Sequence, residues 1–159
     1  MNFSFLLWVI PAYIANSAAT FSKYVPWKRH PVDFGLVLGD GRRLLGDGKT
    51  FEGLFIGVLL GTAAGYIVFT PFGLPYNPFL ISLGALLGDM VGSFAKRRIG
   101  LPRGDPAPVL DQLDFILGAL ALAGPFTAAE TAIIILITPL IHGAANIIGY
   151  FIGVKNEPW

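Results

Sequence analysis

The sequence has no cysteine and few charged residues. Without cysteine the chain forms neither disulfides nor thiolate metal sites. Charged residues make up 13% of the chain, whereas a soluble domain usually carries about 25%. This shortage leaves too little polar surface for a soluble fold. The balance of 11 basic and 10 acidic residues gives a net charge of +1, which offers no indication of a nucleic-acid partner.

Hydrophobic residues, by contrast, make up 54% of the 159 residues, and this content excludes a disordered chain. Four apolar runs approach the roughly 20 helical residues that cross a bilayer. They cover residues 3–21, 53–72, 78–95 and 131–154, and a fifth and shorter run covers about 110–126. The sequence therefore predicts an all-α integral membrane bundle of five transmembrane helices, formed as a single domain over residues 1–159.

The basic residues indicate how the bundle is oriented, because cytoplasmic loops are enriched in Lys and Arg. Six basic residues lie between the first two runs, four lie between residues 95 and 110, and Lys155 follows the last run. The other two connections have neither Lys nor Arg. A topology of five helices with an external N-terminus places all of these basic residues on the cytoplasmic side. A topology of four helices would place Lys155 on the opposite side from the two basic loops. We expect a cell-membrane protein with a cytoplasmic C-terminus, in which any active site is formed by the two cytoplasmic loops.

Glycine recurs at every fourth position in two of the predicted helices. The positions are Gly53, Gly57, Gly61 and Gly65 in one helix, and Gly84, Gly88 and Gly92 in the next. Such rows let helix backbones approach closely in a membrane. We expect them to pack inside the bundle, and a homodimer through these faces is the alternative.

One carboxylate lies within an apolar run. Asp89 is late in the run 78–95, where a charge is costly and by default suggests a functional site. Ser93, Lys96 and Arg97 follow at helical spacing and share its face. A basic helix end that snorkels to the interface and pairs with Asp89 is the structural alternative.

Two further carboxylates favour a functional site. Asp111 and Asp114 are three residues apart at the predicted start of the fourth helix and lie on one face. They could serve as helix caps, although one acid is enough for that role. Two aligned acids at the membrane depth of Asp89 are more typical of oxygen ligands for Mg²⁺, which binds carboxylates together with substrate phosphates. We predict that Asp89, Asp111 and Asp114 hold Mg²⁺.

The loop before the second run repeats a short pattern, Gly-Asp-Gly-Arg at 39–42 and Gly-Asp-Gly-Lys-Thr at 46–50. Glycine-rich backbone with interspersed cations suits a polyphosphate. The pattern is not a P-loop, because Arg43 stands where that motif needs glycine and no buried strand precedes it. A flexible basic loop would explain the cations but not the glycines and aspartates, so phosphate binding is favoured.

Other polar residues carry weaker signals. His142 and Asn146 lie one turn apart in the last run, where interhelical hydrogen bonding and substrate contact both remain open. His30 is a lone loop histidine with no predicted role in the site. No Ser-His-Asp or His-Glu-x-x-His arrangement is present, so acyl-enzyme and zinc chemistry have no support.

Residues 88–97, Gly-Asp-Met-Val-Gly-Ser-Phe-Ala-Lys-Arg, continue to Asp-Gln-Leu-Asp at 111–114. Together they resemble the signature of the CTP:phosphatidate cytidylyltransferase superfamily, in which Ser-x-x-Lys-Arg precedes an acidic pair. The short chain, the five runs and residues 39–53 resemble its archaeal branch, the CDP-archaeol synthases. Bacterial members carry His-Gly-Gly before Asp-Arg-x-Asp. This chain has Ala-Pro-Val-Leu at 107–110 and Gln112 in place of the arginine, which favours an archaeal lipid.

The resemblance implies a Mg²⁺-dependent nucleotidyltransferase of phospholipid biosynthesis. It would transfer CMP from CTP to an unsaturated isoprenoid ether-lipid phosphate, 2,3-bis-O-geranylgeranylglycerol 1-phosphate, giving CDP-archaeol and pyrophosphate. The expected partners are CTP, this lipid and the bilayer. The expected catalytic residues are Asp89, Lys96, Asp111 and Asp114. The expected CTP contacts are Asp40, Arg42, Arg43, Lys49, Thr50, Ser93, Lys96 and Arg97.

Three other functions remain open at this point. A CDP-diacylglycerol synthase would use a different lipid, and a CTP-dependent polyprenol kinase would attack the γ-phosphate and release CDP. A small ion transporter would need a polar track across the bilayer. Apart from His142 and Asn146, the outer half of the apolar runs contains little polar material.

Overall fold

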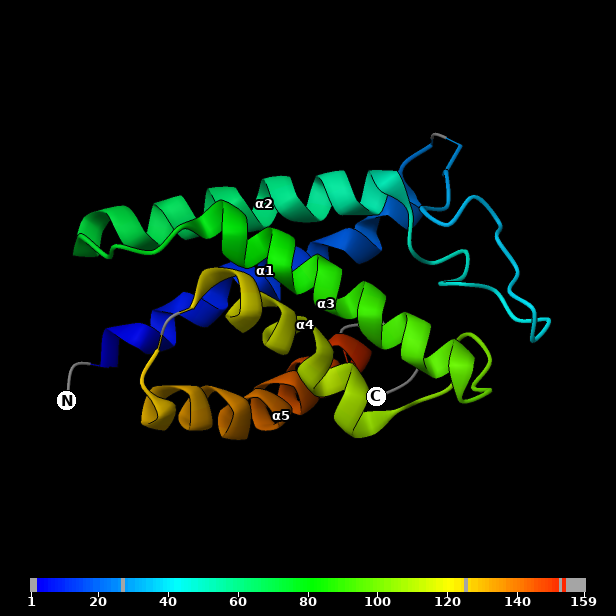
Figure 1. Cartoon of the computed structure of the whole chain (residues 1–159). Coiled ribbons are helices and arrows are strands. Elements are labelled where there is room, and N and C mark those ends of the chain that lie inside the picture. Colours follow the sequence, from blue (N-terminus) through cyan, green and yellow to red (C-terminus); the bar gives the residue numbers. More distant parts are fainter. Residues whose placement is uncertain (1–2, 27, 125, 152, 154–159) are drawn as a thin grey trace.

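The computed structural model describes residues 3–26, 28–124, 126–151 and 153. Within these ranges the chain forms five α-helices, as the sequence predicts, and β structure is limited to two isolated bridges. The helices are α1 (Val9–Ala19), α2 (Phe51–Phe69), α3 (Pro78–Arg98), α4 (Pro108–Ala123) and α5 (Ala128–Phe151). Short 3-10 segments η1 (Phe3–Trp8) and η2 (Thr20–Tyr24) extend α1, and η3 (Thr70–Phe72) extends α2 (Figure 1).

Four helical segments are long and apolar enough to cross a membrane. They are Phe5–Tyr24, Phe51–Phe72, Pro78–Arg98 and Ala128–Phe151. These segments make the chain a multi-pass membrane protein. The predicted last run ends at 154, and Lys155 follows it; both positions lie outside the described residues.

Helix α4 has 16 residues and is about 24 Å long, which is short for a membrane crossing. It still passes from one end of the bundle to the other. Phe126, just after α4, packs on Trp8 and Tyr76, with ring centroids 5.0 and 5.7 Å apart. These rings lie near the start of the chain and in the connection between α2 and α3, so the chain reaches that end of the bundle after α4. Helix α4 itself is not among the four segments that are long and apolar enough to span a membrane, and the fifth transmembrane helix stays a prediction.

The core lies where α1, α3 and α4 meet. Its largest fully buried side chains include Trp8, Phe115, Ile81 and Ile116. The outer helix α5 buries few side chains, among them Ile134 and Thr138.

The two glycine rows pack within the chain, as predicted, but each against a different helix. In α2, a Cβ at Gly57 would lie 2.7 Å from the backbone oxygen of Ala15 in α1. In α3, a Cβ at Gly84 would lie 2.6 Å from the backbone oxygen of Gly118 in α4. Both rows are buried, so these faces are not open to a second copy, and the packing does not support a homodimer through them.

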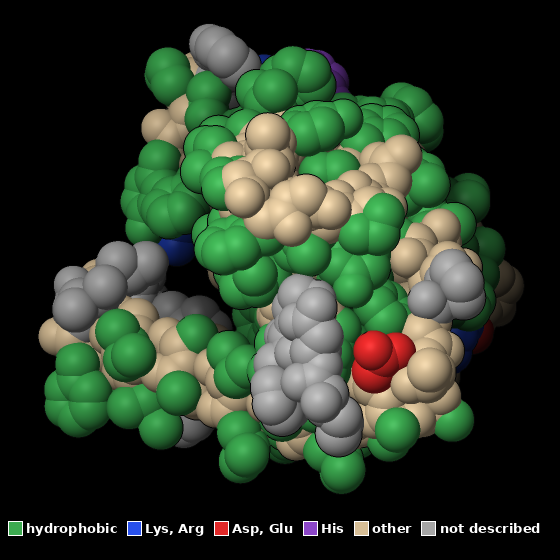
Figure 2. Space-filling view, turned by 90° about the vertical axis from the view of Figure 1, so that its left-hand side faces the viewer, with side chains coloured by type: hydrophobic (Ala, Val, Ile, Leu, Met, Phe, Trp, Pro, Cys, Tyr) green, Lys and Arg blue, Asp and Glu red, His purple; other side chains and the backbone are tan. Residues whose placement is uncertain are grey.

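The two ends of the bundle differ in polarity. Figure 2 views the end where the N-terminus and the α2–α3 connection lie, and its surface is mainly hydrophobic with few charged side chains. The loop 28–50 and the connection between α3 and α4 lie at the opposite end (Figure 1). This asymmetry follows the distribution of Lys and Arg along the sequence.

Candidate active site

Residues 28–50 form an irregular hairpin that returns to the start of α2. Antiparallel bridges join Pro31 to Thr50 and Val37 to Arg43. The amide of Val32 donates to the backbone oxygen of Lys49 at 2.8 Å. Thr50 then caps α2, because its hydroxyl accepts the amide of Gly53 at 3.1 Å. The hairpin thus fixes Lys49 and Thr50 at the beginning of a membrane helix.

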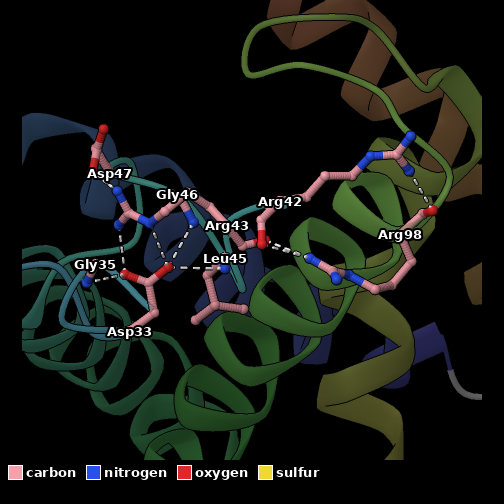
Figure 3. A network of polar contacts seen from close by, with 8 residues as sticks. All are labelled: Asp33, Gly35, Arg42, Arg43, Leu45, Gly46, Asp47 and Arg98. Carbon is pink, nitrogen blue, oxygen red and sulfur yellow. Dashed lines mark hydrogen bonds and ion pairs between the residues drawn. The ribbon is translucent and has the colours of Figure 1, made fainter. Parts of the chain in front are cut away.

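Asp33 is the buried centre of this hairpin (Figure 3). Its side chain is 0% exposed and accepts the Arg43 guanidinium at 2.7 Å. It also accepts the amides of Leu45 and Gly46, each at 3.0 Å, and that of Gly35 at 3.1 Å. Burial alone would raise the pKa of Asp33, but Arg43 and the three amides hold it well below its usual range. Asp33 was not among the residues predicted from the sequence.

The hairpin tip docks on the last turn of α3 through arginines. Arg42 donates to the backbone oxygen of Arg98 at 2.8 Å. Arg98 donates to Asp40 at 2.7 Å. It also donates to the backbone oxygen of Arg43 at 2.6 Å (Figure 3). Asp40, Arg42 and Arg43, all predicted as CTP contacts, therefore hold the loop against α3.

Two lysine–aspartate pairs bring four of the predicted site residues together. Lys49 from the hairpin pairs with Asp89 of α3. Lys96, on the last turn of α3, donates to Asp111 of α4 at 2.7 Å. Asp89 is thus paired with the loop and not with the basic end of its own helix, which removes the snorkelling alternative. The second oxygen of Asp111 accepts the amide of Ala107 at 2.9 Å, so this residue also has the capping role.

Asp114 is buried between α3 and α4, with 8% of its surface exposed. One carboxylate oxygen accepts the amide of Phe115 at 2.6 Å, and Asp114 forms no ion pair with any residue that the structure describes. Its side chain packs on Gly92, where an added Cβ would lie 2.7 Å from the Asp114 Cβ. Gly92, the last glycine of the α3 row, thus leaves the space that the Asp114 side chain occupies.

A cavity of about 640 Å³ lies at the basic end of the bundle. It is bounded by α1 with η2, the start of α2, the second half of α3, the α3–α4 connection, the start of α4 and the second half of α5. Its polar lining residues are Asn16, Ser17, Thr20, Lys23, Lys49, Thr50, Asp89, Lys96, Asp105, Asp111, Gln112, His142 and Asn146. The two lysine–aspartate pairs both open into this cavity, and Asp114 lies just behind its wall.

Several of these lining residues escaped the sequence analysis. Asn16 and Ser17 stand together inside an apolar run, and this polar interruption is a signal that could have identified them. Asp105 precedes the predicted acids and has no distinctive spacing. Gln112 lies between Asp111 and Asp114 and was noted only as a departure from the bacterial pattern, without a place in the site. His30 also has a partner that was not predicted, because its Nδ1 lies 2.7 Å from Glu52 at the start of α2.

The remaining predicted CTP contacts lie outside the cavity. A separate cleft of about 370 Å³ is lined by Arg42, Arg43, Arg97 and Arg103 together with Asp47. Gly48 stands between the two spaces, since a Cβ there would lie 3.5 Å from the Arg103 guanidinium while Gly48 itself lines the cavity. Ser93 is buried on α3 and lines neither space.

The donor set suits a hard divalent cation. Asp89, Asp111 and Asp114 supply only carboxylate oxygens, and Asp89 and Asp111 are close enough to act electrostatically on Asp114. As they stand, the described residues contain no group of three Asp, Glu or His side chains arranged around one metal position. The carboxylates of Asp89 and Asp111 are instead turned to their lysines. The residue types therefore fit Mg²⁺, and occupancy would require exchange of the lysine partners.

The fold and this site define an α-helical multi-pass membrane protein with a charged cavity at its basic end. Sequence comparison places it more narrowly. The chain belongs to the CarS-like family, described as CDP-archaeol synthase, whose family model matches residues 1–159.

Relatives and one solved structure agree with this assignment. The CDP-archaeol synthase of Aeropyrum pernix is 49% identical over 97% of this chain and 90% of its own length. That of Pyrobaculum arsenaticum is 47% identical over 99% of this chain and 98% of its own length. A solved structure of an intramembrane enzyme for archaeal membrane lipids biosynthesis is 48% identical, with a TM-score of 0.78. It covers 89% of this chain, and the match spans 92% of that structure.

Proposed function

We propose that this protein transfers CMP from CTP to an archaeal isoprenoid ether-lipid phosphate, forming CDP-archaeol and pyrophosphate. The observation that carries the proposal is the cavity at the bundle end, whose wall contains both the Lys49–Asp89 and the Lys96–Asp111 pair. The buried Asp114 lies between α3 and α4, three residues beyond Asp111. The names of the relatives supply the reaction class. The cavity supplies cations for phosphate groups and carboxylates for a divalent ion at the membrane boundary, where a lipid phosphate and a water-soluble nucleotide can meet.

In this reaction a phosphate oxygen of the lipid attacks the α-phosphorus of CTP. The new P–O bond forms as the bond to the β-phosphate oxygen breaks, and pyrophosphate leaves with that electron pair. Transfer of this kind depends on positioning and on neutralising charge. Lys49 and Lys96 both reach the cavity and would bind the triphosphate. Mg²⁺ held by Asp89, Asp111 and Asp114 would neutralise phosphate oxygens when bound.

The two lysines have a second role in this proposal. Each ammonium group is now held by a carboxylate. A triphosphate competes for both lysines, and when they turn to it the carboxylates of Asp89 and Asp111 become available for a cation. Nucleotide and divalent ion would therefore bind cooperatively. We also propose that the basic end faces the cytoplasm, which places the N-terminus outside and the cavity on the side where CTP is found.

The test uses the purified protein in liposomes with CTP labelled at the α-phosphate. The acceptors are an isoprenoid ether-lipid phosphate, a diacylglycerol phosphate and a polyprenol, each with Mg²⁺ or with EDTA. We expect label to enter only the ether-lipid product, together with one pyrophosphate per turnover, and only with Mg²⁺. Asp89→Asn in the same liposomes is the inactive control.

Other outcomes would overturn specific parts of this proposal. Release of CDP with a phosphorylated polyprenol would establish a kinase, and transfer to the diacyl lipid alone would establish a CDP-diacylglycerol synthase. Full activity in EDTA would rule out the role of the three aspartates with Mg²⁺. Ion uptake by the liposomes in the absence of CTP would favour a transporter.

A further inference from the structure

The hairpin exposes hydrophobic side chains away from both the cavity and the arginine cleft. Phe34 is 82% exposed, and Leu36 and Val37 are each 52% exposed. None of the three lines the cavity or the cleft. Three exposed apolar side chains in four residues are unexpected in a loop surrounded by water.

The exposure of Phe34 is fixed by the backbone. Phe34 has φ 49°, and among the described residues no other non-glycine residue has positive φ. This region is sparsely populated by bulky residues. The turn is held on both sides, since the amide of Phe34 donates to Pro31 at 3.1 Å and that of Leu36 to Asp33 at 2.8 Å. The buried Asp33 thus anchors the turn that points Phe34 outward.

The position of Phe34 relative to the membrane follows from its neighbour. Its ring lies 5.5 Å from that of Phe51, measured between centroids. Phe51 is the first residue of the membrane segment Phe51–Phe72. Phe55, one turn further on, is 68% exposed on a helix that spans the bilayer. Phe34 therefore continues the lipid-facing surface of α2 beyond the end of the helix.

The charges beside this surface suit lipid headgroups. Lys28 and Arg29 are exposed and directly precede His30, whose backbone oxygen accepts the amide of Phe51 at 3.0 Å. Basic side chains therefore lie at the level where α2 leaves the hydrocarbon. Cations beside aromatic and aliphatic residues are typical of a segment seated at a membrane interface.

We propose that Phe34, Leu36 and Val37 form an interfacial anchor that inserts into the headgroup region of the bilayer beside α2. The partner is the lipid surface, and the anchor is expected whichever lipid phosphate the enzyme uses. The anchor is connected to the site through the hairpin. Asp33, which holds the hairpin together, directly precedes Phe34, and Lys49 directly precedes Thr50, which is bridged to Pro31. The bilayer would thereby hold the loop that carries Lys49 against the bundle.

The absence of cysteine makes a direct test simple, because a single introduced cysteine is the only one in the chain. Phe34→Cys, Phe55→Cys and Gly39→Cys are made one at a time, labelled with a nitroxide and reconstituted in liposomes. Phe55 reports a lipid-facing helix position. Gly39 is a loop control, since no atom lies within 4 Å of an added Cβ there. Power saturation compares the accessibility of each label to oxygen and to a water-soluble nickel chelate.

We expect the oxygen-to-nickel ratio at position 34 to lie several-fold above that at 39 and below that at 55. A ratio at 34 equal to that at 39 would overturn the anchor, because the label would be in water. Low accessibility to both reagents would overturn it too, since another copy or the hairpin itself would then cover the position. Phe34 has positive φ, so Phe34→Cys could alter the turn. Leu36→Cys is a second test with the same expected result, and it can be used if Phe34→Cys misfolds.

Discussion

Lys96 and Asp111 meet at 2.7 Å and join the last turn of α3 to the first turn of α4. Because Asp111 also accepts the amide of Ala107 at 2.9 Å, the pair closes the whole connection between the two helices. The Lys96 ammonium also lies 3.5 Å from the backbone oxygen of Asp105. Lys96 therefore stabilises the connection between α3 and α4 and also lines the cavity. These two roles can be separated by experiment.

Replacing Lys96 with alanine should weaken CTP binding more than it weakens the fold. The Lys96 side chain is 14% exposed and that of Asp111 34% exposed, and a partly exposed pair contributes on the order of 1 kcal/mol to stability. Loss of a cation that contacts phosphate should lower CTP affinity about tenfold or more. Calorimetric titration with CTP and the melting temperature in detergent measure the two effects. Unaltered CTP affinity would show that the triphosphate does not reach Lys96.

Asp114→Asn should abolish turnover while the protein stays folded. The change is nearly isosteric and removes only charge, so the packing on Gly92 is kept. Loss of a group that holds the divalent ion should lower kcat by on the order of 100-fold or more. Turnover is measured with labelled CTP, and folding by melting temperature. The control is Glu130→Gln, which removes a carboxylate at the start of α5, far from the cavity, and should retain activity. Comparable activity in the two variants would show that Asp114 is not part of the active site.

Two glycines of α3 should give different results when replaced with alanine. At Gly88 the new methyl group would meet the backbone oxygen of Asp114, which cannot move aside, so the fold should lose about 1–3 kcal/mol. At Gly92 it would meet the side chain of Asp114, with the Cγ at 2.8 Å. Displacement of that carboxylate should reduce activity more than stability.

Unfolding in detergent and turnover in liposomes, measured on both variants, separate these effects. Gly39→Ala is the control, because nothing lies within 4 Å of the added methyl group. Equal losses of activity and stability at positions 88 and 92 would mean that the close approach of α3 and α4 does not position Asp114.

The helical membrane architecture was predictable because it depends on properties of continuous segments, such as their summed hydropathy. Hydropathy sums over about 20 residues identified the membrane helices, and the spacing of Gly84, Gly88 and Gly92 identified a close-packed face. Which helix each face meets was not predictable, because every candidate partner helix is apolar and hydropathy does not distinguish among them. The short α4 was also uncertain, since it starts among acids and depends on α3 for its place.

The site was predicted less evenly, and the reason is physical. Asp89, Asp111 and Asp114 are exceptional because their charges lie in or beside apolar segments, where the energetic cost is visible in the sequence. Arg42 and Arg43 lie in a polar loop, where a cation that binds phosphate and one that docks a hairpin look alike. The role of Asp33 depends on closure of that hairpin around it, which no local pattern records.

Asp33→Asn should loosen the hairpin, whereas Asp47→Asn should not. Arg43 joins both aspartates, but the Asp33 side chain is 0% exposed and that of Asp47 is 62% exposed. Loss of the buried partner leaves Arg43 without its main acceptor and should cost about 1–3 kcal/mol locally. Loss of the exposed one should cost less than about 1 kcal/mol. Hydrogen exchange of the amides of Leu45 and Gly46, which both donate to Asp33, measures the local opening.

The same amides give a pH test of the Asp33 ion pair. The pKa of Asp33 lies well below its usual range, so the stabilisation is fully present above the ordinary pKa of about 3.9. It is lost only as the pH falls below that value toward the lowered one. After correction for intrinsic exchange, protection of Leu45 and Gly46 should therefore be constant from neutral pH to mild acid. Protection that declines within this interval, or that is equal in Asp33→Asn and the native protein, would show that the Asp33–Arg43 pair does not hold the hairpin that carries Lys49.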